Sequence, residues 1–318
     1  MRLLKIVPDN TNIQFVRARH VAFAITALLT IAAIGLVFAR GLNFGVDFVG
    51  GVAIEEKFVT VPPLDQIRST VDELGVGEAA LQQLGSDSQT VSIRLPLPDD
   101  APEGAADAVV EKVKSALAAK FPGASFSNYT TVSGKVSDEL IRNGVLAVLL
   151  AVFGIAVFSW FRYEWQFGVS TAVAILHDVL MTLGFFALTR MAFDLNIVAA
   201  VLTIIGYSIN DKMVIDDRIR ENMRKFRKMD MPQLIDLSVN ETLPRTVMTS
   251  LTILLALGSL LIFGGHVLRG FTSAMILGVI VGTYSSVYVS SSLLITLKLK
   301  PGTKMGPSEA TAAERMTP

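Results

Sequence analysis

The sequence predicts an α-helical membrane protein with six transmembrane helices and one small α+β domain between the first two of them. Three observations lead to this fold class. The chain of 318 residues is 51% hydrophobic and has a mean hydropathy of +0.53, well above the range of a water-soluble domain. Most of its apolar residues lie in runs of about 20, the length needed to cross a bilayer. A long stretch after the first run instead contains polar, charged and apolar residues interspersed.

Six predominantly apolar runs are the expected membrane spans. The first run follows Arg17, Arg19 and His20 and ends in a sequence that resembles a signal-peptide cleavage site. Because this run is longer than the apolar core of a typical signal peptide, we expect a retained helix there. The six expected spans are residues 21–39, 144–161, 167–188, 197–215, 246–263 and 271–297.

Basic residues in the short loops predict the orientation of the chain, because Lys and Arg concentrate on the cytoplasmic side of a membrane. They precede the first span and follow the fourth and the sixth, whereas the short loops of the opposite side contain only Arg190 and Arg269. Both termini are therefore expected in the cytoplasm. The expected parts are residues 1–40 with the N-terminus and first span, 41–138 as an external, periplasmic α+β domain, 139–300 with the other spans and a basic cytoplasmic loop at about 217–243, and 301–318 as a disordered cytoplasmic tail.

The external domain is expected to fold by itself, because turn signals such as Pro62, Pro63 and the stretch 96–104 punctuate its sequence. Alternating apolar residues predict strands in it, and apolar residues at helical spacing predict helices. The resulting order is β-α-β-β-α-β, which is the ferredoxin-like arrangement. The expected elements are strand 52–59, helix 64–74, strand 80–84, strand 91–95, helix 105–121 and strand 125–132.

The charged and metal-binding residues argue against several classes of function. Lys and Arg together number 28, as do Asp and Glu, so the net charge of +0 gives no reason to expect nucleic acid as a partner. The chain has no Cys and only three His, which lack the spacing of a metal site, so no metal is expected. Since no nucleophile paired with a base and no phosphate-binding loop is recognisable, an enzyme is the least expected class and no cofactor is predicted.

The third span contains two ionisable neighbours, His177 and Asp178. An ionised carboxylate at the centre of a bilayer costs about 3 kcal/mol, so Asp178 is expected to face protein or water. Thr171 and Thr182 share its helix face, and a polar seam therefore follows this span. Two interpretations stay open for Asp178: a structural hydrogen bond to a neighbouring helix, and a role in proton movement. His177 is the weaker candidate, because a single His in such a helix often serves only as a hydrogen-bond donor.

The fourth span carries Asn210 and Asp211 in its cytoplasmic half, and Arg245 begins the fifth span at a similar depth. A carboxylate that can exchange apolar surroundings for a cationic neighbour can bind and release a proton. Because ionisable residues inside a membrane are functional by default, Asp211 is the strongest candidate for a titrating group. Small and polar residues line one face of each span, namely Ala199, Thr203, Gly206 and Asn210 in the fourth and Arg245, Thr249, Thr252, Ala256 and Ser259 in the fifth.

Two further patterns receive structural interpretations. Asp216 and Asp217 fall at the expected membrane boundary and are followed by Arg218, so we expect both carboxylates to be solvated. Gly278 and Gly282 form a small-xxx-small pattern in the sixth span, which indicates close helix packing and needs no functional explanation.

Several segments carry family signatures. Residues 45–51 read Gly-Val-Asp-Phe-Val-Gly-Gly, in which Asp47, Phe48, Gly50 and Gly51 are the distinctive positions. Further signature segments are His-Asp-Val at 177–179, Gly-Tyr-Ser-Ile-Asn-Asp at 206–211, Asp-Arg-Ile-Arg-Glu-Asn at 217–222 and Asn-Glu-Thr-Leu-Pro-Arg-Thr-Val-Met-Thr-Ser at 240–250. Together with the six spans and the external domain, these segments resemble the SecD/SecF family of protein-export membrane proteins, and its SecF branch in particular, over nearly the whole chain.

The resemblance implies one six-helix half of a bundle of the resistance-nodulation-division superfamily, completed by SecD and placed beside the SecYEG channel in the bacterial inner membrane. In this family proton flow is coupled to polypeptide export. Asp211 and Arg245 match the proton-pathway positions of the family, with Asn210, His177 and Asp178 as supporting candidates. The implied coupling ion is the proton, and the implied partners are SecD, SecYEG, YajC, the exported polypeptide and membrane lipid.

The sequence departs from the common family pattern at Lys212, where a small hydroxyl residue is frequent, and at Asp216, where an apolar or aromatic residue is frequent. Both changes add charge near Asp211 and leave its electrostatic surroundings open. The two glycines at 50–51 are open to two interpretations as well, a hinge that sets the angle of the external domain and a simple tight turn.

Two rival functions are alternatives to proton-coupled export. A small-molecule exporter of the same superfamily would need a much larger external region to enclose a drug-sized pocket of about 300 Å³ or more. A passive scaffold would only stabilise a partner, and it predicts that neutralising Asp211 leaves export unaffected.

Overall fold

The computed structural model describes residues 8, 11–77, 79–84, 88–97, 104–265 and 267–300, so the tail expected at 301–318 lies outside the described residues. Within the described part, six helices are long and apolar enough to cross a membrane, and each contains an expected span to within one residue. In chain order they are η1 (Val16–Ala18) with α1 (Arg19–Arg40), α5 (Gly134–Arg162), α6 (Trp165–Thr189), α7 (Leu195–Lys225), α8 (Met231–Phe263), and a last helix built from α9 (Arg269–Tyr284), η2 (Ser285–Ser290) and α10 (Ser291–Thr296).

The centre of the bundle is formed by α6, α7 and α9. Half of the residues in the most apolar stretch of α6 are buried, against 6% in that of α5. Close helix approach at small residues holds the centre together. A Cβ atom added at Gly278 would lie 2.4 Å from the side chain of Ile204, and one at Gly184 would lie 2.5 Å from Ala33. The packing role expected for the glycines of the sixth span is confirmed at Gly278, and Gly282 approaches Ser208 in the same way.

The last helix contains an interruption that its sequence pattern did not predict. Segment η2 is π-helical, with Tyr284 and Ser291 in ordinary helical conformation on either side. Ser285, Ser286 and Ser290 of this segment are fully buried. Because π segments are uncommon and often occur at functional sites, η2 indicates that the buried part of the last helix is a candidate functional region.

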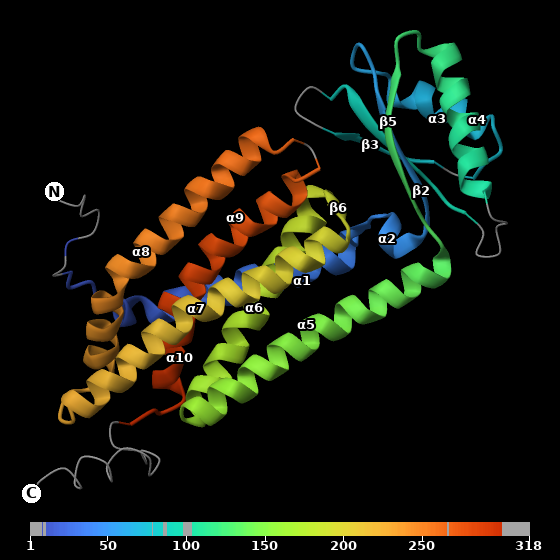
Figure 1. The fold of residues 1–318 in the computed structure, drawn as a ribbon. Helices are drawn as coiled ribbons and strands as arrows, with labels where there is room; N and C mark the ends of the chain where they lie inside the picture. The colour runs from blue at the N-terminus through green and yellow to red at the C-terminus, as the bar shows by residue number, and fades with distance from the viewer. Residues whose placement is uncertain are drawn as a thin grey trace, which may run out of the picture.

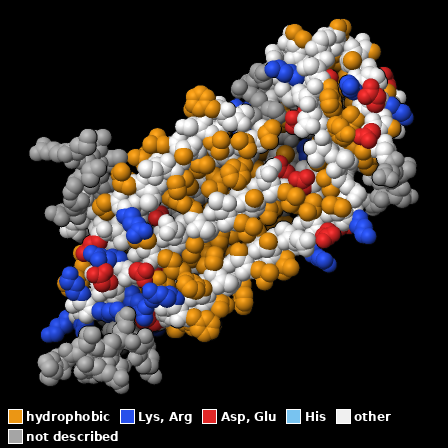
Figure 2. Space-filling model, viewed as in Figure 1, with side chains coloured by type: hydrophobic (Ala, Val, Ile, Leu, Met, Phe, Trp, Pro, Cys, Tyr) orange, Lys and Arg blue, Asp and Glu red, His pale blue; other side chains and the backbone are white. Residues whose placement is uncertain are grey.

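The two helices α7 and α8 extend well beyond the spans expected from hydropathy. α7 continues to Lys225 and α8 begins at Met231, so most of the basic segment at 217–243 is helical. Pro232 lies in the first turn of α8, where a missing N–H breaks no helical hydrogen bond. Lys and Arg side chains gather at this end of the bundle (Figure 2), and the α+β domain stands at the opposite end (Figure 1).

The α+β domain has its elements in the expected order, β2 (Gly51–Lys57), α3 (Leu64–Asp72), β3 (Ala80–Leu84), β4 (Thr90–Leu95), α4 (Ala105–Lys120) and β5 (Ser125–Val132). The strands form one four-stranded antiparallel sheet in the order β3-β4-β2-β5. Side chains that alternate along β2 and β4 point toward α3 and α4, which cover one face. The fully buried members of this core include Val52, Ile54, Ile67, Val71, Val91, Ile93, Val113 and Leu117.

A small junction joins this domain to the bundle. The chain leaves α1 into β1 (Asn43–Phe44), passes through the single turn α2 (Val46–Val49) and enters β2. β1 pairs in parallel with β6 (Ala192–Phe193), which connects α6 to α7. Neither the pairing nor α2 was expected, because two-residue strands and one-turn helices carry almost no periodic signal.

Candidate functional site

Asp211 is buried on α7, with 3% of its surface exposed. One of its carboxylate oxygens, Oδ2, is buried and has no hydrogen-bond partner among the described residues. Arg245 of α8 is close enough to interact with this carboxylate electrostatically, and Thr246, buried on the same turn, is a second polar neighbour. Although both residues are described, Asp211 and Arg245 do not form a direct ion pair. The structure therefore brings the two predicted residues into one neighbourhood and leaves the carboxylate partly unsatisfied.

The small and polar faces expected on α7 and α8 lie at the surface of this chain. Of the nine residues that make up the two faces, all but Thr249 are exposed, and a Cβ atom at Gly206 would meet nothing within 4 Å. A largely white band follows α7 between orange, hydrophobic surfaces in Figure 2. We call this surface the polar stripe; it consists of Ala199, Thr203, Gly206 and Asn210 on α7 and Arg245, Thr252, Ala256 and Ser259 on α8.

The expectation that Asp216 is solvated is wrong. Asp216 is fully buried and forms an ion pair with Lys212, which is itself 2% exposed. The Lys212 ammonium also lies 5.7 Å from the centre of the Phe167 ring, on α6. The reason for the error is that α7 continues for nine residues after Asp216, so the expected end of the span at 215 is not the end of the packed helix. The charges of Lys212 and Asp216 thus compensate each other rather than acting on Asp211.

Asp217, in contrast, is exposed as expected. Its carboxylate accepts a hydrogen bond of 2.9 Å from the Tyr163 hydroxyl and lies 3.7 Å from the guanidinium of Arg162. Burial raises the pKa of Tyr163, in the turn between α5 and α6, and the bond to Asp217 raises it further. This phenol therefore stays protonated and keeps donating to Asp217.

Asp178 joins three helices. Its Oδ2 accepts hydrogen bonds from Ser208 of α7 at 2.6 Å and from Ser285 of the π segment η2 at 3.0 Å. Its Oδ1 lies 3.0 Å from Nδ1 of His177, whose Nε2 is buried without a hydrogen-bond partner among the described residues. These contacts agree with the interpretation of Asp178 as a hydrogen-bonding link between helices.

The segment of Asp47, Phe48, Gly50 and Gly51 forms the junction itself. Asp47 Oδ2 accepts a hydrogen bond of 3.0 Å from the backbone N–H of Leu195, at the start of α7. Gly50 and Gly51 have φ angles of +74° and +107°, which favour glycine. A Cβ atom at Gly51 would lie 2.2 Å from the carbonyl oxygen of Leu95, so the two glycines form a close-packed crossing of the chain.

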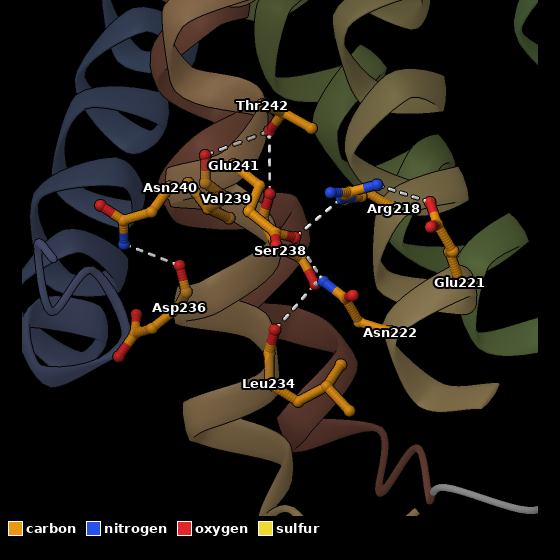
Figure 3. A network of polar contacts seen from close by, with 10 residues as sticks. All are labelled: Arg218, Glu221, Asn222, Leu234, Asp236, Ser238, Val239, Asn240, Glu241 and Thr242. Carbon is orange, nitrogen blue, oxygen red and sulfur yellow. Dashed lines mark hydrogen bonds and ion pairs between the residues drawn. The ribbon is translucent and has the colours of Figure 1, made fainter. Parts of the chain in front are cut away.

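Sequence reasoning missed a polar network between the C-terminal part of α7 and the N-terminal part of α8 (Figure 3). Glu241 accepts hydrogen bonds of 2.7 Å from Arg218 and from Asn222, and Asn222 also donates to Ser238 at 3.0 Å. Two signature segments, 217–222 and 240–250, meet in this network. Each contains charged residues of both signs, and this pattern was the sequence signal that could have indicated their contact. Asn240 on the same turn exchanges two hydrogen bonds of 2.9 Å with the backbone of Ile13 and so fixes the N-terminal segment to α8.

Comparison with known proteins identifies the family. Residues 112–300 match the family described as protein export membrane protein SecD/SecF, C-terminal, and residues 35–55 match the SecD/SecF GG motif. The chain is 41% identical to the protein translocase subunit SecF of Cereibacter sphaeroides over 304 residues, with 94% of both chains covered. This chain belongs to the SecD/SecF family.

Other SecD/SecF relatives agree. The chain is 41% identical over 307 residues to the protein translocase subunit SecF of Rhodobacter capsulatus and 38% identical over 292 residues to that of Rickettsia felis, covering at least 92% of each chain. The crystal structure of SecDF from Thermus thermophilus matches with a TM-score of 0.84 and 36% identity over 92% of this chain. A SecDF structure in a super-membrane-facing form matches with a TM-score of 0.68 and 36% identity over 96% of this chain. This chain corresponds to 40% of the SecDF chain in both structures.

Proposed function

We propose that this chain acts as a SecF-type subunit that uses the proton motive force to assist protein translocation through the SecYEG channel. The observation that carries the proposal is the buried, partly unsatisfied carboxylate of Asp211 beside Arg245, on a chain of the SecD/SecF family. Relatives that match almost the full chain are named protein translocase subunits. Protons are the proposed coupling ion, with Asp211 as the group that binds and releases them.

The proposed mechanism rests on the contact between α7 and α8. When Asp211 is ionised, its charge attracts Arg245, which is exposed and free to approach. Protonation removes this attraction and lets Arg245 turn toward other partners. The two groups are not in direct contact. A small change in the packing of α7 against α8 can therefore switch Arg245 between an arrangement close to Asp211 and one turned away from it.

A SecD-type chain is the proposed partner at the polar stripe. The hydroxyl groups of the polar stripe already donate to backbone carbonyl oxygens of their own helices, as Thr203 does to Ala199 at 2.7 Å. Arg245 and Asn210, in contrast, are exposed and would lie in lipid if no other protein covered them. Small residues on the stripe also allow a second helix to approach closely. SecYEG, YajC, the exported polypeptide and lipid remain further proposed partners.

The proposed setting is the bacterial inner membrane with both termini in the cytoplasm. Support comes from the Lys and Arg side chains at the end of the bundle away from the α+β domain (Figure 2), since such charges stay on the cytoplasmic side. The α+β domain is then periplasmic. Its order of elements and its sheet order support a ferredoxin-like fold.

Substitution of the two proposed residues tests the function. Asp211→Asn keeps the size and hydrogen-bonding capacity but cannot titrate, and Arg245→Met removes the charge and keeps an apolar stem. We expect both variants to assemble at normal levels and to lose most of the stimulation of export by a proton gradient in inverted or reconstituted vesicles. Asp217→Asn is the matched control, because Asp217 lies on the same helix but is exposed. It should keep full stimulation.

The same measurement separates the proposal from its rival. Normal gradient-dependent export by a correctly assembled Asp211→Asn variant would contradict the mechanism and favour a passive scaffold. Loss of assembly would instead point to a structural role for the substituted residue, such as packing of the buried Asp211 side chain between α7 and α8. For this reason the level of assembled protein is measured for each variant.

A further inference from the structure

We infer that Asp47 is a positioning residue that couples the outer end of α7 to the α+β domain, so that a movement of α7 at Asp211 changes the placement of that domain. The inference rests on the proposed function, because it assigns a route to the motion that Asp211 would start. It differs from a flexible hinge at Gly50 and Gly51, since it requires a stiff connection.

The first step is the attachment of the junction to α7. The backbone N–H of Leu195 is one of the groups at a helix start that lack a partner within the helix, and Asp47 supplies that partner from outside. Asp194, the N-cap residue of the same helix, accepts from Ile197 at 3.2 Å. Two carboxylates therefore hold one helix start, and the one from Asp47 is delivered by a segment 148 residues away in the chain.

The second step is the rigidity of the junction. Its backbone is fixed by the parallel pairing of β1 with β6 and by a hydrogen bond of 2.8 Å from Gly45 N to Phe193 O. The rings of Phe44, Phe48 and Phe193 pack against one another, with centroids 5.9 to 6.0 Å apart. Phe48 and Phe193 also belong to the buried core that contains Ile204 of α7. The junction therefore has to move together with the outer half of α7.

The third step is the attachment of the junction to the domain. Arg94, on β4, donates to the backbone oxygen of Phe44 at 2.6 Å and to the side chain of Asn43 at 2.9 Å. Gly51 is the first residue of β2, and it lies so close to the carbonyl of Leu95 on β4 that a side chain at this position would clash with that carbonyl. A displacement of α2 is thus passed to two adjacent strands of the sheet.

A single helix, α7, connects the proposed proton site at Asp211 to the junction below the α+β domain. Asp211 lies sixteen residues after Leu195 on one helix, which corresponds to about 24 Å at 1.5 Å per residue. A cleft of about 600 Å³, lined by polar and apolar residues alike, lies between the open face of the sheet and the outer end of the bundle and gives the domain space to move. Gln83 and Val267 line opposite sides of that cleft.

The test measures movement across the cleft. Because the chain has no cysteine, Gln83→Cys and Val267→Cys provide two specific sites for nitroxide labels. The full chain is purified with the proteins that stay bound to it and placed in lipid nanodiscs, and the distance between labels is measured by pulsed electron paramagnetic resonance. Asp211→Asn serves as the mimic of the protonated state, with and without Asp47→Ala or Asp47→Asn.

We expect Asp211→Asn to shift the distance distribution when Asp47 is present. Asp47→Ala should abolish this shift, and Asp47→Asn, which keeps an accepting oxygen, should restore it. A purely structural role would change the distribution in Asp47→Ala but would not remove its response to Asp211→Asn. A normal shift in the Asp47→Ala variant overturns the inference, and so does the absence of a shift in the chain with Asp47 intact.

Gradient-stimulated export by the labelled proteins keeps this result separate from the proposed function. Loss of stimulation in Asp211→Asn without a change in distance would leave the proton-coupled function standing and refute only the route through Asp47. Undiminished stimulation in Asp211→Asn would refute the proposed function itself, whatever the distances show.

Discussion

Lys212 and Asp216 are the two charges on α7 with the least access to solvent. Removing one member of such a pair leaves an uncompensated charge at a cost of about 3 to 5 kcal/mol, whereas replacing both by apolar residues is often neutral or favourable. We expect Asp216→Leu to reduce the yield of folded, monodisperse protein sharply and the combination of Asp216→Leu with Lys212→Met to recover most of it. Size-exclusion profiles and thermal midpoints in mild detergent provide the measurement.

A double variant that is no more stable than Asp216→Leu would show that the pair has a role beyond mutual neutralisation. Export is measured on the same proteins, because Lys212 adjoins Asp211 in the sequence. If the recovered double variant also exports normally, the two charges that depart from the family pattern are structural.

At the level of single residues, the sequence named two residues that the structure places near each other, and it misjudged the charges around them. Asp211 could be singled out because a charged residue inside an apolar run is evident from the sequence alone, and Arg245 because it directly precedes the next apolar run. The burial of Asp216 could not be predicted, because it depends on how far α7 continues and on Phe167 from another helix. The hydrogen-bond partners of Asp178 could not be predicted either. Nothing in the sequence distinguishes Ser208 and Ser285 from other serines, and only the packing of three helices brings their hydroxyls to Asp178.

The start of α7 is the element whose stability should depend on pH. Burial raises the pKa of Asp194 above its ordinary value of 3.8, and Asp47 raises it as well, against the opposing effect of the N–H groups of the first turn. The folded chain therefore binds this proton more strongly than the unfolded chain, so the contribution of Asp194 to stability falls as the pH rises above 3.8. Asp194→Asn keeps an N-cap acceptor and removes this dependence.

We accordingly expect Asp194→Asn to have a higher thermal midpoint than the unchanged chain at pH 7. The difference should shrink as the pH is lowered and vanish below about 3.8, where the carboxyl is protonated in both states. A lower midpoint for Asp194→Asn at pH 7 would mean that the negative charge at the helix start outweighs its burial.

The crossing of the chain at Gly51 should tolerate no side chain. Gly51→Ala would combine a positive φ with a clash on the Leu95 carbonyl, each costing about 1 to 3 kcal/mol. Gly41→Ala is the matched control, because Gly41 also has a positive φ, +65°, but open space around its Cβ position. We expect Gly51→Ala to insert into the membrane and yet to be cut faster by an added protease in the α+β domain.

Equal protease resistance of the two variants would show that conformation alone, and not the close contact, limits position 51.

Among the elements, those of the α+β domain were predicted to within a few residues because alternation and helical spacing are strong there. The π segment η2 was not, since one extra residue per turn over six residues disturbs the apolar period too little to be seen.

For the whole molecule, the polar stripe predicts stable pairing with another membrane protein. The small residues of the sixth span need no outside partner, because Gly278 and Gly282 pack on α7 within this chain. Those of α7 do, since Gly206 has open space beside it. We expect affinity isolation in mild detergent to recover a SecD-type chain, and we expect Gly206→Leu to reduce the recovered amount. Gly154→Leu, on an open face of α5, is the control.

Recovery of a monomeric chain that is fully active in export would contradict this expectation. The six spans and the separate α+β domain were predictable because length and hydropathy determine what can cross a bilayer. How the domain is attached was not, because the pairing of Phe44 with Phe193 connects residues that lie far apart in the chain.

That attachment also constrains the order of events during biosynthesis. At about 5 to 20 residues per second, the ribosome needs roughly 7 to 30 s to extend the chain from Asp47 to Leu195, which is 148 positions later. The α+β domain is complete by Val132 and can fold while α5 to α7 are still being made. During this interval β1 has no strand to pair with, and Asp47 has no helix start to cap. The newly made domain is therefore tethered but not yet oriented, and its final placement is a late step of membrane insertion.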